Sequence, residues 1–356
     1  ALREEARQAT ASGDAERARL AAQNGLRLTD DAATVRELLD IARRAYASLP
    51  AYRRLPALRL IPAGRQEVLT GGSRRMEAAP TSQALADELL FLGLYDEGAP
   101  QLAVAEHALD NDADDEDKPA HEDEDAADRS SPAPGSTPST VAQQSSSASR
   151  DQAYTLAVYF KRGDHANHAI RFAEPLWKSV PADYLLELAP RELVELLYPA
   201  PYRAALLECA PPRGVDPRFV LAIARQESRF RPEAKSGAAA RGLLQFIPST
   251  ANTIAGQLNL RGFRQDDLYD PRVAVLLGSQ YMGNLFRQFP GMPQAVAASY
   301  NGGEDNVARW VARARSNDPD RYVPEIGFTQ SKDYVYKVLP NFWVYQSLYT
   351  EHLQRR

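Results

Sequence analysis

A long polar stretch in the middle of the sequence limits the folds that are open to this chain. Between Asp110 and Asp128 there are eleven acidic residues and one lysine, a local charge of -10. A run rich in Ser and Pro follows at 130–149 (SSPAPGSTPSTVAQQSSSAS). Such a segment buries too little apolar surface to offset the entropy that is lost on ordering. We therefore expect residues 106–150 to form a disordered insertion between two folded parts.

The charge outside this acidic block is mildly basic. The 356 residues carry a net charge of -5, which leaves +5 for everything outside the block. This value suits an anionic polymer as partner and is too small to indicate a nucleic acid. We expect the acidic block to act as a weak electrostatic shield over a basic cleft. No apolar run approaches the roughly 20 residues that span a bilayer, so the sequence predicts no transmembrane segment.

The candidate metal ligands of the sequence do not form a complete set. Cys209 is the only cysteine, which excludes an intrachain disulfide and a thiolate cluster. Aspartates alternate at 110–114 as in a calcium loop, but the glycine and the closing glutamate of such a loop are absent. His165 and His168 lack a third ligand nearby, so we interpret them as surface residues. We predict no metal site and no cofactor.

Residues 1–105 and 151–200 have the periodicity of helices. In 82–105, leucines and alanines form an apolar helical face, and a turn around Gly93 and Gly98 separates two helices. Short helix pairs of this kind are typical of an α-solenoid resembling tetratricopeptide-type repeats. The sequence therefore predicts a mainly α chain whose first part is a superhelical solenoid.

A glutamate in the second half of the chain combines burial with a helix end. A helix begins at Asp216-Pro217, and Glu227 follows Ile223 by four residues and Val220 by seven, so its carboxylate lies on the apolar stripe. Desolvation and the negative helix end both oppose ionisation, which predicts a pKa above the usual ~4.3. Such an acid can hold a proton at neutral pH and donate it to a leaving oxygen. The alternative is a glutamate paired with a neighbouring arginine.

Three ordered blocks resemble those of the family 1 lytic transglycosylases. The first, ESRFRPEAKSGAAARGLLQFIPSTA at 227–251, resembles a signature of Glu-Ser, Gly-Leu-Met-Gln and Pro-x-Thr-Ala. The second, ASYNGG at 298–303, resembles Ala-Tyr-Asn-Ala-Gly-Pro. The third, PEIGFTQSKDYVYKV at 324–338, resembles an element of the large soluble murein transglycosylases. This sequence departs from the pattern with Leu244 in place of Met and Glu304 in place of Pro.

The resemblance is specific over about 197–356 and implies a lysozyme-like catalytic domain at 201–356, after the solenoid. The implied substrate is the β-1,4 bond between N-acetylmuramic acid and N-acetylglucosamine in peptidoglycan. Glu227 would act as general acid and then as base on the C6 hydroxyl of the muramic acid, which gives a 1,6-anhydro end without consuming water. The resemblance implies that five residues bind the substrate: Ser236, Gln245, Tyr300, Asn301 and Glu325.

Two other functions stay open. The first is hydrolysis of the same bond by an enzyme of the same fold, resembling goose-type lysozyme. The second is a non-catalytic scaffold of the cell envelope that binds glycan. The resemblance implies a location in the periplasm or cell envelope, with peptidoglycan strands as partner and envelope proteins as possible partners of the solenoid.

Overall fold

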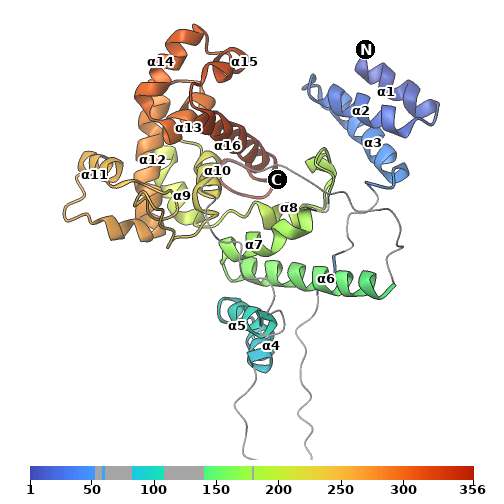
Figure 1. The fold of residues 1–356 in the computed structure, drawn as a ribbon, viewed down its shortest axis with the longest axis horizontal. Coiled ribbons are helices and arrows are strands. Elements are labelled where there is room, and N and C mark those ends of the chain that lie inside the picture. The colour runs from blue at the N-terminus through green and yellow to red at the C-terminus, as the bar shows by residue number, and fades with distance from the viewer. Residues whose placement is uncertain (53–57, 61–81, 108–139, 179) are drawn as a thin grey trace, which may run out of the picture. The chain divides into compact units, whose positions relative to one another are not determined.

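The structure is a computed structural model, and the chain in it divides into two compact units, Ala1–Leu197 and Tyr198–Arg356 (Figure 1). The described residues are 1–52, 58–60, 82–107, 140–178 and 180–356. Within them, regular structure is helical, and β-pairing is limited to isolated bridges. None of the described helices combines the length and the apolar run that a membrane span requires.

Most of the predicted insertion at 106–150 falls on 108–139, which lie outside the described residues. Its two ends are helical, because α5 (Tyr95–His107) extends into it and α6 (Thr140–Arg162) begins before it ends. The composition predicts order only from about residue 151. Pro138 is the last proline before α6, and the Ala and Gln residues that follow it are compatible with a helix.

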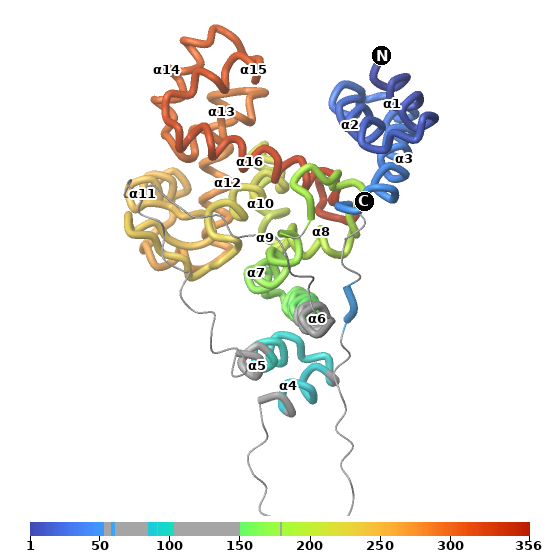
Figure 2. Tube along the Cα trace, turned by 45° about the vertical axis from the view of Figure 1, so that its right-hand side comes forward, coloured from blue at the N-terminus to red at the C-terminus, as the bar shows by residue number. Residues whose placement is uncertain are grey.

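In the first unit, helices pack against their neighbours along the chain within two runs. Besides α5 and α6, the elements are α1 (Leu2–Ala11), α2 (Ala15–Leu26), α3 (Ala32–Ser48), α4 (Ser82–Phe91), α7 (Ala166–Trp177), η1 (Leu186–Leu188) and α8 (Arg191–Leu197). Successive helices are in contact from α1 to α3 and from α4 to α8, and Figure 2 shows α6 beside α7. This nearest-neighbour packing is the pattern of a helical solenoid.

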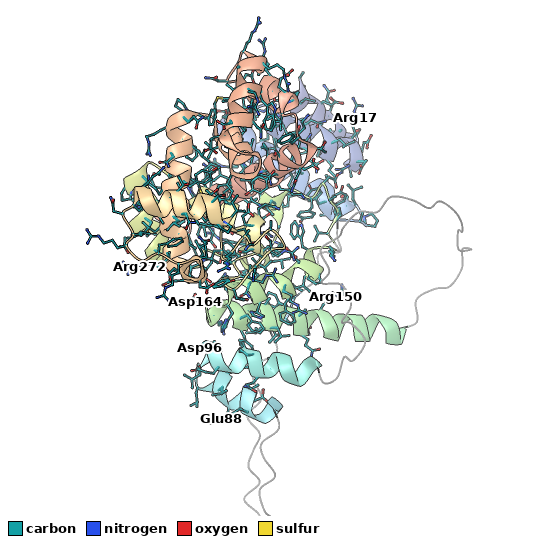
Figure 3. All side chains as sticks on the ribbon, turned by 60° about the vertical axis from the view of Figure 1, so that its left-hand side comes forward. Arg17, Glu88, Asp96, Arg150, Asp164 and Arg272 are labelled. Atoms are coloured by element: carbon teal, nitrogen blue, oxygen red, sulfur yellow. The ribbon has the colours of Figure 1, made fainter. Side chains whose placement is uncertain are left out.

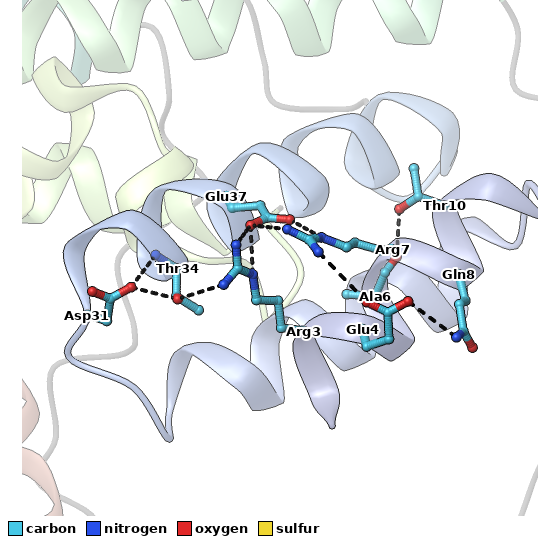
Figure 4. Close-up of polar contacts among 9 residues, drawn as sticks. All are labelled: Arg3, Glu4, Ala6, Arg7, Gln8, Thr10, Asp31, Thr34 and Glu37. Atoms are coloured by element: carbon cyan, nitrogen blue, oxygen red, sulfur yellow. Dashed lines mark hydrogen bonds and ion pairs between the residues drawn. The ribbon is translucent and has the colours of Figure 1, made fainter.

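Small side chains allow α1, α2 and α3 to approach closely. Ala6, Ala22 and Ala42 are completely buried in their common core. At the edge of this core, Glu37 of α3 contacts two arginines of α1 (Figure 4). Glu37 accepts a hydrogen bond from Arg3 Nε at 2.7 Å and forms an ion pair with Arg7. Exposed ion pairs contribute little to stability, so alanine packing is the main determinant of this arrangement.

Glycines allow close contacts at three places in the stretch from α4 to α7. Gly93, with φ of +79°, makes the predicted turn between α4 and α5. Gly98 lies inside α5 and not in this turn. A Cβ on Gly98 would approach Leu90 Cγ to 2.9 Å. A Cβ on Gly163, between α6 and α7, would lie 2.7 Å from the backbone nitrogen of Asp96 at the start of α5. Figure 3 shows Asp96 beside Asp164 at this edge.

In the second unit, three Asp-Pro pairs define helix starts. Its elements are α9 (Arg203–Cys209), η2 (Pro211–Arg213), α10 (Pro217–Ser228), α11 (Pro248–Gln257), η3 (Gln265–Tyr269), α12 (Pro271–Gln288), α13 (Pro293–Gly302), α14 (Glu304–Ala314), α15 (Pro319–Tyr322), η4 (Val323–Glu325) and α16 (Thr329–Leu348). Asp216, Asp270 and Asp318 each accept a hydrogen bond from a backbone N–H of the first turn, at 2.8–3.0 Å. Proline at the first helical position has no N–H that needs an acceptor, so the Asp-Pro pair fixes the start of α10, α12 and α15.

Helix α10 lies in the core of this unit. Its residues from Pro217 to Ala224 are all buried, and α10 and α13 both pack against α16 (Figures 1 and 2). Only the last turn of α10 reaches a less buried environment, at Arg225 to Glu227. The core helix therefore presents its C-terminal end to the site described next.

Candidate active site

Glu227 projects from the last turn of α10, as the apolar spacing predicts. The helix ends at Ser228 because Arg229 and Phe230 both adopt left-handed conformations, with φ of +49° and +64°. Phe230 is 1% exposed, so the strained turn is anchored by a buried ring. The backbone therefore leaves the helix immediately after the glutamate and leaves its side chain beside a cleft.

Burial makes the Glu227 carboxyl a weaker acid than an ordinary glutamic acid. Desolvation raises its pKa from 4.5 to about 7, and a hydrogen bond from Tyr334 acts in the opposite direction. Tyr334, on α16, donates its hydroxyl to Glu227 Oε1 at 2.5 Å. Burial and the adjacent Glu227 raise the pKa of the Tyr334 hydroxyl well above 10, so this group stays a donor. At neutral pH both forms of Glu227 are populated, which suits a general acid and base.

Hydrogen bonds from side chains to backbone carbonyls hold the loop after α10 in place beside the cleft. Ser228 donates its hydroxyl to the carbonyl of Leu243 at 2.8 Å. Gln245 Nε2 donates to the carbonyls of Gly242 at 2.9 Å and Ala234 at 3.1 Å. Gly242 has φ of +75°, and a Cβ there would lie 2.0 Å from the carbonyl oxygen of Leu268. The Gly-Leu-Leu-Gln element is thus a turn that requires glycine at its first position.

Aromatic rings form one wall of the same region. Tyr300 of α13 donates its hydroxyl to the carbonyl of Leu244 at 2.8 Å. Its ring centroid lies 5.5 Å from that of Tyr281 and 6.1 Å from that of Phe246. Burial and, to a smaller degree, Glu227 raise the pKa of Tyr300 well above 10. The Tyr300 hydroxyl is therefore a fixed neutral donor next to the acid.

These side chains surround a cleft of about 290 Å³. It is lined by Glu227, Gln245, Phe246, Ile247, Thr250, Tyr281, Ser299, Tyr300, Asn301, Gly303 and Glu304. Among these described residues there are two carboxylates and no lysine or arginine. The lining of this cleft is therefore not basic as expected, and the acidic block that was expected to shield it lies outside the described residues.

Comparison with known proteins identifies this part of the chain. The transglycosylase SLT domain family matches residues 207–323. Over these residues the chain is similar to a transglycosylase SLT domain. It is 37% identical over 136 residues to a putative soluble lytic murein transglycosylase of Haemophilus influenzae, and 28% identical over 148 residues to the soluble lytic murein transglycosylase of Escherichia coli. These matches cover 38% and 41% of this chain but 23% of each relative, so the chain spans about a quarter of their length.

The fold also has a counterpart among solved structures. The 70-kDa soluble lytic transglycosylase in complex with bulgecin A superposes with a TM-score of 0.52 at 17% sequence identity. The match covers 99% of this chain and 52% of the other chain. The predicted fold class, a helical solenoid followed by a lysozyme-like domain, is confirmed. The SLT match lies entirely inside the compact unit Tyr198–Arg356.

Three of the five predicted substrate-binding residues line this cleft. Gln245 and Tyr300 do so through the contacts described above. Asn301 also lines it, and its Oδ1 accepts a hydrogen bond from the Ser331 hydroxyl at 2.8 Å, which links α13 to α16. The two remaining residues, Ser236 and Glu325, are not among the lining residues of this cleft.

The structure gives Ser236 and Glu325 other contacts. The exposed Ser236 hydroxyl accepts a hydrogen bond from the backbone nitrogen of Ala240 at 3.1 Å and so closes a tight loop. Glu325 forms an ion pair with Arg313 Nε at 2.5 Å, and both side chains are substantially exposed.

The sequence interpretation did not single out three side chains that contact Glu227 or line the cleft. Tyr334 lies 107 residues from Glu227 along the chain, and its contact depends on the packing of α16 against α10. A signal was present, because Tyr334 belongs to the third resembling block. The sequence interpretation assigned no role to Tyr281 and treated Glu304 only as a departure from the family pattern.

The two histidines form no metal site. Their rings pack against Phe160, and His165 Nε2 lies 3.2 Å from the carbonyl oxygen of Asp96. Throughout the described part of the chain, no group of three or more His, Cys, Asp or Glu side chains is arranged to hold a metal ion.

Proposed function

We propose that this protein is a lytic transglycosylase that cleaves the glycan strands of peptidoglycan, with Glu227 as its acid and base. The observation that carries this proposal is a partly buried glutamic acid, its pKa raised to about 7, on the wall of a cleft in a region that matches the SLT domain family. The names of the relatives at 37% and 28% identity support peptidoglycan as the substrate. A non-catalytic glycan-binding scaffold has no use for such an acid.

The proposed reaction breaks one bond and forms another. Glu227 donates its proton to the glycosidic oxygen while the bond between that oxygen and C1 of N-acetylmuramic acid breaks, with oxocarbenium character at C1. The Glu227 carboxylate then accepts the proton of the C6 hydroxyl while O6 bonds to C1. The products are a 1,6-anhydro-muramic acid end and a free hydroxyl on N-acetylglucosamine. Glu227 returns to its starting form, and no water is consumed.

The other cleft residues would position the sugar. Gln245 and Asn301 present polar groups to the cleft, and Tyr300 presents a fixed aromatic ring next to the reacting carboxyl. Because O6 belongs to the substrate, its effective concentration at C1 is high, and the mechanism needs no second catalytic carboxylate. The roles predicted for Ser236 and Glu325 stay predictions, as does the boundary of the catalytic domain at residue 201.

Hydrolysis is the second candidate, because Glu304 also lines the cleft. A hydrolase of this kind uses a second carboxylate to activate water or to attack C1. One oxygen of Glu304, however, is engaged by Tyr281. We favour the transglycosylase and propose that it acts where peptidoglycan lies, in the cell envelope. A periplasmic location and protein partners of the solenoid stay predictions.

Product analysis tests the proposal. Purified peptidoglycan is digested with wild type and with Glu227→Gln, and the released fragments are weighed by mass spectrometry. We expect anhydro-muramic acid ends, one water lighter than reducing ends, from wild type and none from Glu227→Gln. Glu233→Gln is the matched control, since Glu233 is exposed and does not line the cleft. Reducing ends would establish the hydrolase, and release by Glu227→Gln at the wild-type rate would exclude Glu227 as the acid.

A further inference from the structure

The cleft contains a carboxylate that the proposed reaction does not use. Glu304 is the first residue of α14 and lines the same cleft as Glu227. Its Oε2 accepts a hydrogen bond from the Tyr281 hydroxyl at 3.1 Å. Among the described residues that line the cleft, none is basic. Glu304 is therefore a partly buried acid without a cationic neighbour on the cleft wall.

A purely structural role for Glu304 is an acid at the positive end of a helix. The contacts do not support this as its whole role. The N-cap of α14 is Gly303, and no side chain caps the first turn. The Glu304 side chain instead reaches across to α12, where it meets Tyr281. Asp305, the next residue, is exposed in the same first turn and complements the helix end without entering the cleft.

Tyr281 holds Glu304 in place from the facing helix. Burial, followed by the charge of Glu304, raises the pKa of the Tyr281 hydroxyl, so it remains protonated and donates. The ring of Tyr281 is itself fixed against Tyr300 at 5.5 Å between centroids. The phenol thus occupies Oε2 of Glu304 and restricts its rotation, while Oε1 remains as an acceptor for a ligand in the cleft.

We propose that Glu304 and Tyr281 form a subsite that prefers a glycan unit with a free, protonated amino group to its N-acetylated counterpart. This inference rests on the proposed function, because it takes the occupant of the cleft to be a strand of amino sugars. An ammonium group makes a charge-assisted hydrogen bond to a carboxylate, about twice as strong as that of a neutral amide N–H. The absence of basic residues from the described cleft wall leaves the carboxylate available for this contact.

Binding to a catalytically silent background tests the subsite. In Glu227→Gln, Glu304 is the one carboxylate left among the residues that line the cleft. Calorimetric titrations at low salt compare fully N-acetylated chitotetraose with its fully de-N-acetylated form, at a pH where the amines are protonated. We expect the ammonium form to bind roughly tenfold more tightly, from the difference between a charge-assisted and a neutral hydrogen bond.

Three double variants decide whether Glu304 is responsible. Glu227→Gln/Glu304→Gln should lose the preference, and Glu227→Gln/Tyr281→Phe should reduce it by releasing Glu304. Glu227→Gln/Asp305→Asn removes the same formal charge one residue away and should keep the preference. The proposal would be overturned if Glu227→Gln bound the two sugars equally or bound neither. It would also be overturned if the preference for the ammonium form persisted in the Glu304 variant, or if the Asp305 variant lost that preference to the same extent. The proposed function fails separately, if wild type releases no fragments from peptidoglycan.

Discussion

The acidity of one residue in this site depends on a second residue far along the chain. Tyr334 donates to Glu227, which favours the ionised carboxylate and opposes the effect of burial. In the proposed reaction Glu227 must start protonated, so wild-type activity should fall as pH rises through about 7. In Tyr334→Phe the pKa of Glu227 rises further, and we expect the alkaline limb of kcat/KM against pH to move upward by up to about one unit.

The pH profile has a matched control on the same helix. Tyr336 is 61% exposed on α16, so Tyr336→Phe removes a hydroxyl without touching Glu227. Its alkaline limb should coincide with that of wild type. A limb that does not move in Tyr334→Phe, or that moves equally in both variants, would mean that the hydrogen bond does not set the acidity of Glu227.

At the same scale, the sequence predicts residues whose environment is local. Glu227 follows from helical spacing and from a contiguous block, and both act within one element. Glu325 belongs to the third block that resembles the family, yet its side chain pairs with Arg313, twelve residues earlier in the chain. Tyr334 and Glu304 acquire their roles from contacts between helices. Spacing within one helix contains no information about such contacts.

At the scale of the element, the Gly-Leu-Leu-Gln turn in the loop between α10 and α11 depends on its glycine. A side chain at Gly242 would collide with the backbone of Leu268 and would be held at φ of +75°. We expect Gly242→Ala to lower the free energy of unfolding by about 2 kcal/mol or more, because backbone cannot move aside as a flexible side chain can. Urea unfolding followed by tryptophan fluorescence measures this loss.

A second glycine of the same loop provides the comparison. A Cβ on Gly237 would have no neighbour within 4 Å, and its backbone is not left-handed. Gly237→Ala should change the free energy of unfolding by no more than about 0.5 kcal/mol. Equal losses in the two variants would contradict the steric argument. The Asp-Pro starts of α10 and α12 were predictable because capping is local chemistry, whereas the contact between Gly242 and Leu268 is tertiary.

At the scale of the whole molecule, every residue that lines the cleft lies in one of the two compact units. The lining residues fall between Glu227 and Glu304, and the tyrosine that supports Glu227 belongs to α16 of the same unit. Periodicity predicted the solenoid class of the other unit. The site provides no reason for the solenoid to take part in the chemistry, which separates bond cleavage from whatever the solenoid contributes to handling a polymer.

This separation predicts the behaviour of the second unit alone. Residues 198–356, produced without the solenoid, should convert short soluble glycan fragments to the same anhydro products as the full chain, with a similar kcat. Circular dichroism first establishes that the fragment is helical, and Glu227→Gln in the fragment should abolish release. If the folded fragment makes no product while the full chain does, the first unit completes the site. If it cleaves short fragments but not intact peptidoglycan, the solenoid acts in binding the polymer, because the groups that transfer the proton are all present in Tyr198–Arg356.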